Sequence, residues 1–263
     1  MGVRIGYPDH WRDYASLVIK RDDLLGDVQR AAAFDWNYSV MRIDQPVDRT
    51  DWGTPQTVNA GFDAETNAIL FPAGILQPPF FDPNADDAVN YGAIGAVIGH
   101  EISHGFDTVG GKFDADGNVK NWWGKEDKKS FEFRTNALIE QYGLFEPLPG
   151  LRVNGANTLG ENIADNAGVE IALKAYHLSL GNETAPIIDG YTGDQRFFLS
   201  FAQSRRTKMR DARLRQQMQS NVHCPESFRV IGTLRNLDEW YSAFDVNPGD
   251  KYYLDPSRRV HLW

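Results

Sequence analysis

The stretch that most constrains this chain is His100-Glu101-Ile102-Ser103-His104, in which two histidines stand four residues apart. On an α-helix, side chains at positions i and i+4 share one face with Cβ atoms about 5–6 Å apart, so both imidazoles can bind one metal ion. Glu101 is rotated by about 100° from His100 around the helix axis, so its carboxylate can reach a water molecule on that metal. The alternative is chance, two histidines and a glutamate on an ordinary helix, and the neighbouring residues must decide.

The residues before this motif favour a buried helix. Ala88 to Gly99 contain no charge and no proline and are apolar on most sides, which is typical of a helix enclosed by protein. Asp86 or Asp87 can cap its start and Gly105 can end it. Histidines and a glutamate buried there without partners would cost several kcal/mol, and a bound metal removes that cost.

A catalytic zinc site usually has three protein ligands and one water position, so a third ligand is needed. The longer pattern with a third histidine fails, because Asp107 stands where its glycine should be and Gly110 where its last histidine should be. The best candidate is Glu161, near the start of a helix expected over about 158–178. Asp165 lies on the same face and could accept a hydrogen bond from a ligand histidine. A solvated acidic helix face is the alternative that the spacing alone leaves open.

Five motifs together carry a family resemblance. They are Val58-Asn59-Ala60, the segment Phe71 to Phe81 (FPAGILQPPFF), His100 to Asp107 (HEISHGFD), Gly160 to Asp165 (GENIAD), and His223-Cys224-Pro225 followed by Phe228-Arg229-Val230. In this order they resemble the neprilysin family of zinc metallopeptidases, over about Val58 to Trp263. The resemblance implies an α+β fold that is mainly α, a thermolysin-like zincin catalytic lobe with a short β segment at the active-site edge.

The resemblance also implies a zinc-dependent endopeptidase with one Zn²⁺ per chain. His100, His104 and Glu161 match the zinc ligands, and Glu101 matches the general base that activates the water. Asp165 matches the carboxylate that orients a ligand histidine.

Further positions are matched in the same way. Asp107 is expected to assist Asp165 behind the ligands. Asn59 and Ala60 match the edge segment that binds an extended peptide substrate. His223 matches the histidine that steadies the tetrahedral intermediate, and Arg229 the arginine that holds substrate carbonyl groups. Cleavage on the amino side of bulky apolar residues follows from the same likeness.

Charge and cysteine content bound the partners and the location. The formal net charge of −9 argues against nucleic acid. The basic run of Arg205, Arg206, Lys208, Arg210, Arg213 and Arg215 is interpreted as a solvated helix face rather than a polyanion site. No apolar run approaches the roughly 20 residues of a membrane span, and residues 1–20 lack the apolar region of a signal peptide. Cys224 is the single cysteine. Because animal members of the family that this chain resembles rely on several disulfides, the resemblance implies a bacterial-type member. The resemblance favours an extracytoplasmic location, periplasmic or secreted.

Two regions are expected along the chain. Residues 1–57 are expected to form an N-terminal helical segment that packs on the catalytic lobe, with a helix at about 22–41. Residues 58–263 are expected to form the catalytic domain. Residues 57–76 are expected to be extended, and residues 114–118 to form a tight turn. Helices are expected at about 124–142, 158–178, 194–219 and 237–244.

Three functions remain open. The first is an active zinc peptidase. The second is a zinc-binding pseudo-peptidase, against which the intact Glu101, His223 and Arg229 argue. The third is a catalytic lobe that is inactive without a separate N-terminal lobe or chain, because members of the family have a much longer N-terminal portion.

Overall fold

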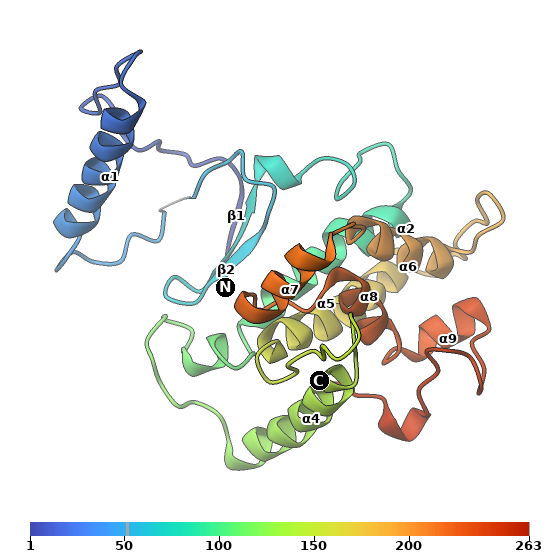
Figure 1. Ribbon diagram of the computed structural model, residues 1–263. Helices are drawn as coiled ribbons and strands as arrows, with labels where there is room; N and C mark the ends of the chain where they lie inside the picture. The colour runs from blue at the N-terminus through green and yellow to red at the C-terminus, as the bar shows by residue number, and fades with distance from the viewer. Residues whose placement is uncertain (51–52, 263) are drawn as a thin grey trace. The chain divides into compact units, whose positions relative to one another are not determined.

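The computed structural model describes residues 1–50 and 53–262. The chain forms two compact units, one of Met1–Gly6 with Pro55–Trp263 and one of Tyr7–Thr54. The smaller unit holds helix α1 (Leu24–Met41), which Figure 1 labels. Its N-cap Asp23 accepts a hydrogen bond from the Gly26 amide. The helix expected near 22–41 is confirmed, whereas the first six residues fall into the larger unit. The packing of residues 1–57 on the lobe stays a prediction.

A small sheet forms one edge of the larger unit. Its strands are β1 (Gly2–Gly6), β2 (Gly61–Asp63) and β3 (Ala68–Pro72), in the order β1-β3-β2. β1 runs parallel to β3, and β2 runs antiparallel to it with Phe62 opposite Ile69. The expected extended region over 57–76 is thus confirmed for the two strands β2 and β3, but it is wrong for Ala73–Ile75, which form a 3₁₀ turn. The pairing of β3 with the first residues of the chain was not predicted.

The helix that carries the two histidines begins as the sequence predicts. The Asp86 side chain accepts a hydrogen bond from the Ala88 amide at the start of α2 (Asp87–Asn90). The chain continues through a π-helical turn, η2 (Tyr91–Gly95), into α3 (Ala96–His104). Gly105 is the C-cap residue. The wider π turn was not predicted, since the apolar pattern is the same for both kinds of helix.

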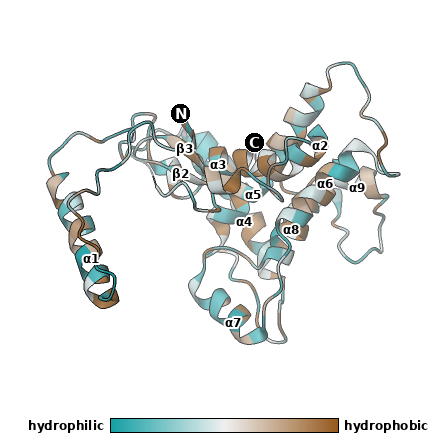
Figure 2. Cartoon of the chain, turned by 90° about the horizontal axis from the view of Figure 1, so that it is seen from above, coloured by the Kyte–Doolittle hydropathy of each residue, from teal (hydrophilic) through white to brown (hydrophobic). Residues whose placement is uncertain are grey.

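Helix α5 (Leu159–Ser179) packs against α3 with its backbone in direct contact. A Cβ atom at Gly99 would overlap the carbonyl of Gly168, and a Cβ at Gly168 would overlap the amide of His100. The glycines, which cost about 0.5–1 kcal/mol each in a helix interior, therefore permit this close approach. Figure 2 shows the apolar colouring of α3 and α5 within this unit.

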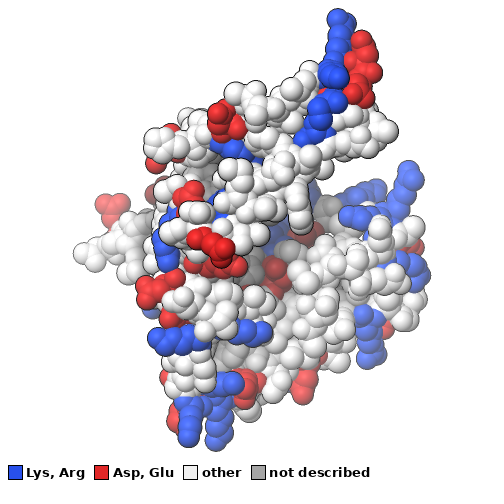
Figure 3. All heavy atoms as spheres, turned by 90° about the vertical axis from the view of Figure 1, so that its left-hand side faces the viewer, with Lys and Arg blue, Asp and Glu red and all other residues white. Residues whose placement is uncertain are grey.

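The remaining helices cover this pair. They are α4 (Lys125–Gly143), α6 (Gly193–Ser204), α7 (Asp211–Ser220), α8 (Glu226–Leu234) and α9 (Asp238–Phe244), with short 3₁₀ turns η1 (Ala73–Ile75), η3 (Gly110–Lys112) and η4 (Pro256–Arg258). Among the described residues, three apolar clusters fill the core. One is centred on Phe197 and Phe201 of α6 against α5, and one on Leu138 of α4 against Ile163 of α5. The third joins Phe71 of β3 to Val97 of α3. Acidic and basic side chains are interspersed on the face that Figure 3 shows.

Two expectations about the helices are corrected. The single helix at 194–219 is wrong, because α6 ends at Ser204 and α7 begins at Asp211. Four cations within six residues (Arg205, Arg206, Lys208 and Arg210) would repel one another along one helix. Helix α8 was not predicted at all. The tight turn at 114–118 is confirmed, with Asp114 Oδ1 accepting from the amides of Asp116 and Asn118. Among the described residues, no helix is long and apolar enough to cross a membrane.

Candidate metal centre

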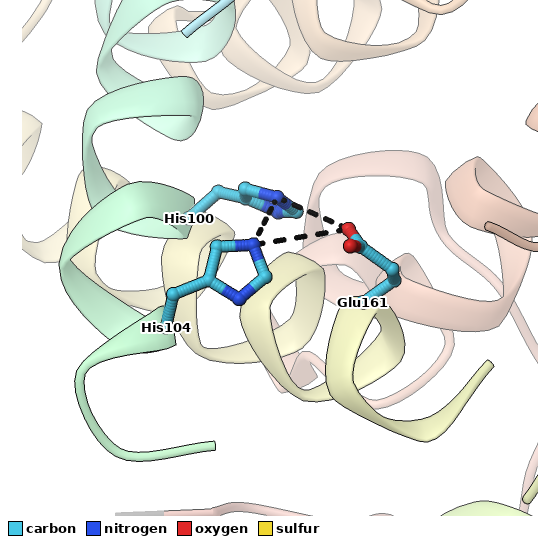
Figure 4. A group of neighbouring side chains, drawn as sticks. All are labelled: His100, His104 and Glu161. Carbon is cyan, nitrogen blue, oxygen red and sulfur yellow. Dashed lines mark hydrogen bonds and ion pairs between the residues drawn. The ribbon is translucent and has the colours of Figure 1, made fainter. Parts of the chain in front are cut away.

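Three candidate ligands meet where α3 packs on the first turn of α5 (Figure 4). The Nε2 atoms of His100 and His104 lie 3.0 Å apart. Glu161 Oε2 lies 3.4 Å from His100 Nε2 and 3.8 Å from His104 Nε2. Ligand atoms about 2.0–2.1 Å from a tetrahedral zinc ion would be about 3.3 Å apart. The three side chains therefore already have nearly the spacing of a zinc site.

The carboxylate of Glu161 supplies a separate test of whether a metal fits. Its Oε2 atom is buried and has no hydrogen-bond partner within the described chain. His223 Nε2 is 2.9 Å away, but not in the geometry of a hydrogen bond. A buried carboxylate oxygen without a partner is costly, and a cation between it and two imidazoles would satisfy it. The residues present thus fit a divalent metal ion such as Zn²⁺.

Two aspartates fix the orientation of the histidines. His100 Nδ1 is 2.8 Å from Asp165 Oδ1, and His104 Nδ1 is 2.7 Å from Asp107 Oδ2. Asp107 is itself held by the amides of Val109 and Gly110, at 2.7 and 2.8 Å. A carboxylate at Nδ1 favours the tautomer that leaves Nε2 with a lone pair for a metal. Both histidines are therefore set in the ligand orientation.

Asp165 lies at the centre of a buried charge cluster. Arg229 donates to it from Nε at 2.6 Å and from Nη2 at 2.8 Å, and Arg205 Nη2 lies 3.3 Å from Oδ1. Burial by itself raises the pKa of Asp165, but the charges of Arg229 and Arg205 and the bond from His100 outweigh it and hold the pKa well below its usual range. Asp165 therefore presents a carboxylate to His100 at any pH near neutral.

The cluster changes the expectation for two arginines. Arg205 was interpreted as part of a solvated helix face, and this is wrong, since its side chain is 14% exposed and directed at Asp165. Arg205 lies four residues after buried Phe201, and this spacing puts both residues on the inner face of α6. The spacing could have indicated a buried arginine, but the run of basic residues favoured the solvated interpretation. Arg229 uses two donors on Asp165, while its Nη1 lies 3.8 Å from Glu226. Its contact with substrate carbonyl groups stays a prediction.

Glu101 lies in the same site and is almost completely buried. It is 6% exposed, and burial raises the pKa of its carboxyl group, an effect that the charges of His100 and His104 partly oppose. A carboxylate with a raised pKa suits proton transfer near neutral pH.

One cavity of about 390 Å³ joins these residues. Nine of the residues singled out from the sequence line it, namely Asn59, Ala60, His100, Glu101, His104, Asp107, Glu161, His223 and Arg229. Asp165 is fully buried and contacts the cavity wall through His100 and Arg229. The structure thus brings the predicted residues together, while their individual roles stay predictions.

The site combines two histidines from one helix with a carboxylate from a second helix, and a buried glutamate lies beside them. This is the arrangement of zinc-dependent hydrolases. Comparisons agree: a family model described as Peptidase family M13 matches residues 59–260. Neprilysin-11 of Caenorhabditis elegans is 42% identical, over 94% of this chain and 32% of its own length. Neprilysin of Homo sapiens is 36% identical, over 99% of this chain and 36% of its own length. The chain belongs to peptidase family M13 and spans about a third of the length of these curated relatives.

Solved structures support the same placement. An inhibitor complex of the zinc metalloprotease Zmp1 of Mycobacterium tuberculosis superposes on 100% of this chain, with a TM-score of 0.96 and 52% identity, and the match covers 41% of that chain. PepO of Lactobacillus rhamnosis gives a TM-score of 0.89 at 38% identity, over 99% of this chain and 40% of that one. The resemblance to neprilysin and the mainly α fold expected from the sequence are both confirmed.

Proposed function

We propose that this chain is the catalytic part of a zinc-dependent endopeptidase with one zinc ion per chain. The observation that carries the proposal is the group of His100, His104 and Glu161, with a buried Glu161 oxygen that lacks a hydrogen-bond partner among the described residues. Membership of family M13 supports the same activity. When bound, zinc polarises the scissile carbonyl group and lowers the pKa of its water toward about 7.

Glu101 acts as the general base and then as the general acid. It accepts a proton from the attacking water and delivers it to the leaving amine, a role that typically contributes about 10²–10⁴-fold to the rate. Asp165 and Asp107 keep His100 and His104 oriented through their Nδ1 atoms. No serine or cysteine nucleophile is needed for this chemistry.

The substrate lies extended beside strand β2. This strand pairs with β3 on one side, and in the sheet that the structure describes its other side has no partner strand. Asn59 and Ala60 come directly before β2 and line the cavity. A peptide added to this edge would gain main-chain hydrogen bonds, while its side chains enter the cavity. The apolar residues Ile75 and Phe80 in the wall support cleavage on the amino side of a bulky apolar residue.

His223 steadies the oxyanion of the tetrahedral intermediate, and Arg229 positions the substrate. The His223 ring donates from Nδ1 to Asn221 Oδ1, at 2.9 Å, which leaves Nε2 facing Glu161 and the cavity. In its protonated form the ring also donates from Nε2, and this is the form that stabilises the oxyanion. A donor aimed at a developing oxyanion is typically worth about 2.7–4 kcal/mol. Arg229 can offer Nη1 to a substrate carbonyl while its other donors hold Asp165.

Cleavage of a peptide library before and after zinc removal tests the proposal. Mass mapping should show cuts before leucine, phenylalanine and similar residues, lost on chelation and restored by zinc. A dominant preference for charged residues after the cut would contradict the specificity, and activity that survives complete zinc removal would contradict the mechanism.

The location is proposed on the family likeness alone, as periplasmic or secreted. Fractionation of the cells that produce the protein tests it, and recovery of the protein only with the cytoplasmic fraction would contradict it.

A further inference from the structure

Arg205 is held firmly at the end of α6, and the roles proposed above leave it without a function. It is the C-cap residue of the helix. Its guanidinium carbon lies 5.9 Å from the ring centroid of buried Phe201, one helical turn earlier. The negative end of the helix dipole favours a cation at this position. The guanidinium group is therefore fixed in the protein rather than solvated on its surface.

Most donors of Arg205 lack an acceptor among the described residues. The one hydrogen bond recorded for its side chain runs from Nη2 to Asp165 Oδ1 at 3.3 Å, which is long for a charge-assisted bond. Arg229 already holds Asp165 with bonds of 2.6 and 2.8 Å. The Nε atom of Arg205 is buried without a partner. A guanidinium has five N–H donors, so this side chain is placed for an acceptor from outside the chain.

The cavity defines the acceptor that would suit Arg205. Arg205 lines it together with the apolar side chains of Ile75, Phe80 and Val97. Glu101 and Glu161 line it too, and they would repel a carboxylate. An apolar stem that ends in an uncharged acceptor matches all of these walls.

We propose that Arg205 determines specificity, by selecting substrates whose side chain in this cavity has an apolar stem and an uncharged acceptor at its tip, such as glutamine or tyrosine. The inference rests on the proposed function and refines it: between bulky side chains of matched size, such as methionine and glutamine or phenylalanine and tyrosine, the one with an uncharged acceptor at its tip is preferred. Without a substrate, the donors of Arg205 other than the one on Asp165 have no acceptor in the described part of the chain, and an acceptor-tipped side chain can pair with such a donor where an all-apolar one cannot. Sites built to hydrogen-bond a substrate group discriminate strongly against analogues that lack it.

A purely structural role for Arg205 makes a different prediction. If Arg205 served only to balance the charge of Asp165, its loss would weaken zinc binding or folding and would affect all ligands alike. The ratio between matched ligands would not change. The decisive quantity is therefore the preference for glutamine over methionine, or tyrosine over phenylalanine, at this position.

Binding of peptide hydroxamates to the zinc-loaded protein measures that ratio without requiring catalysis. The side chain beside the metal-binding group is glutamine, methionine, tyrosine or phenylalanine, and calorimetry gives each Kd for wild type, Arg205→Met and the control Arg206→Met, which alters an exposed neighbour. Arg205→Met should lower the glutamine-to-methionine preference by about tenfold or more, because a bond to a charged donor is lost. Arg206→Met should leave it unchanged. An equal ratio in wild type and Arg205→Met would overturn the inference.

A second variant and the wild-type affinities complete the test. If circular dichroism shows that Arg205→Met is unfolded, Arg205→Lys replaces it and should show a smaller loss of preference in the same direction. A wild type that binds the methionine ligand about tenfold more tightly than the glutamine ligand overturns the inference whatever the variants do. Cleavage of the matching peptides is measured in parallel. Discrimination among hydroxamates without cleavage would contradict the proposed function alone, and cleavage without discrimination would contradict the Arg205 inference alone.

Discussion

The orientation of the metal-binding histidines in this site depends on residues that lie behind them. His100 is oriented by Asp165, which in turn is held by Arg229 from helix α8. Removing one partner of a buried charge pair leaves the other charge uncompensated, which typically costs about 3–5 kcal/mol. The residues behind the ligands are therefore expected to matter for zinc affinity as well as for stability.

Glu101→Gln should retain zinc and lose most peptidase activity. The amide is nearly isosteric with the carboxylate, so packing survives, but it cannot accept the proton of the attacking water. The expected loss in kcat is about 10²–10⁴-fold. Steady-state kinetics with zinc analysis measures both quantities, and Glu140→Gln, at an exposed carboxylate, is the control. Hydrolysis within a few-fold of the wild-type rate would remove Glu101 from the role of base.

His223→Phe should lower kcat with little change in KM, because the hydrogen bond to the oxyanion forms only in the transition state. Zinc should stay bound, since the proposed ligands are intact. His223 Nε2 is 2.9 Å from Glu161 Oε2, so metal analysis of this variant is a sharp check. Zinc loss would make His223 a ligand and would reopen the assignment of Glu161.

The residues of the site differed in how far their sequence context revealed them. The histidine pair follows from local helix geometry, because both ligands lie on one turn of α3. Glu161 needed the family motif, since spacing cannot say which distant carboxylate meets that turn. Arg205 was missed because its charge pattern matched a solvated face, while its burial depends on where α6 packs.

At the scale of elements, the contact between α3 and α5 sets the ligand spacing. Gly99 and Gly168 lie where the two backbones touch, so the ligands from both helices approach within bonding distance of a common point. The helices themselves were predictable from apolar patterning and caps. Their contact was not, nor was the pairing of β1 with β3, because both join segments far apart in the sequence. The break between α6 and α7 was not predicted either, because the basic run that follows α6 carries no glycine or proline to mark a helix end.

Gly99→Ala should destabilise the fold and weaken zinc binding together. The added methyl group would collide with the backbone of Gly168 and push α3 from α5, and overpacking of this kind typically costs about 1–3 kcal/mol. Gly143→Ala in α4 is the matched control, since nothing lies within 4 Å of its added Cβ. That control should be neutral or more stable by up to about 1 kcal/mol. Denaturant unfolding and zinc titration measure both variants, and equal behaviour would contradict the close-contact account.

For the whole molecule, the proposed zinc ion would add a second link between α3 and α5, which are otherwise joined by packing and by the hydrogen bond between His100 and Asp165. A ligand that binds only the folded state stabilises it by about 4.1 kcal/mol at a thousand times its Kd. The thermal midpoint should therefore fall on chelation and recover with added zinc, as calorimetry would measure. An unchanged midpoint in a protein that demonstrably gains and loses zinc would show that the ion does not join α3 to α5.

The length of the chain bears on its activity as a whole. It spans about a third of the length of its curated relatives. We therefore propose, as the alternative to an independent enzyme, a catalytic lobe that depends on a separate N-terminal lobe or chain. Assays of this chain alone and with the remaining region of a family member supplied separately distinguish the two. Activity only in the mixture would support dependence on a partner lobe, and equal activity in both would support an independent enzyme.

The central claim is that His100, His104 and Glu161 hold one zinc ion. Zinc content per chain, measured by mass spectrometry after dialysis against a weak chelator, tests it in the wild type, His100→Ala and Glu161→Ala. The account predicts one zinc per wild-type chain and a large loss in both variants, with folding checked by circular dichroism. Wild-type occupancy in both folded variants would contradict it.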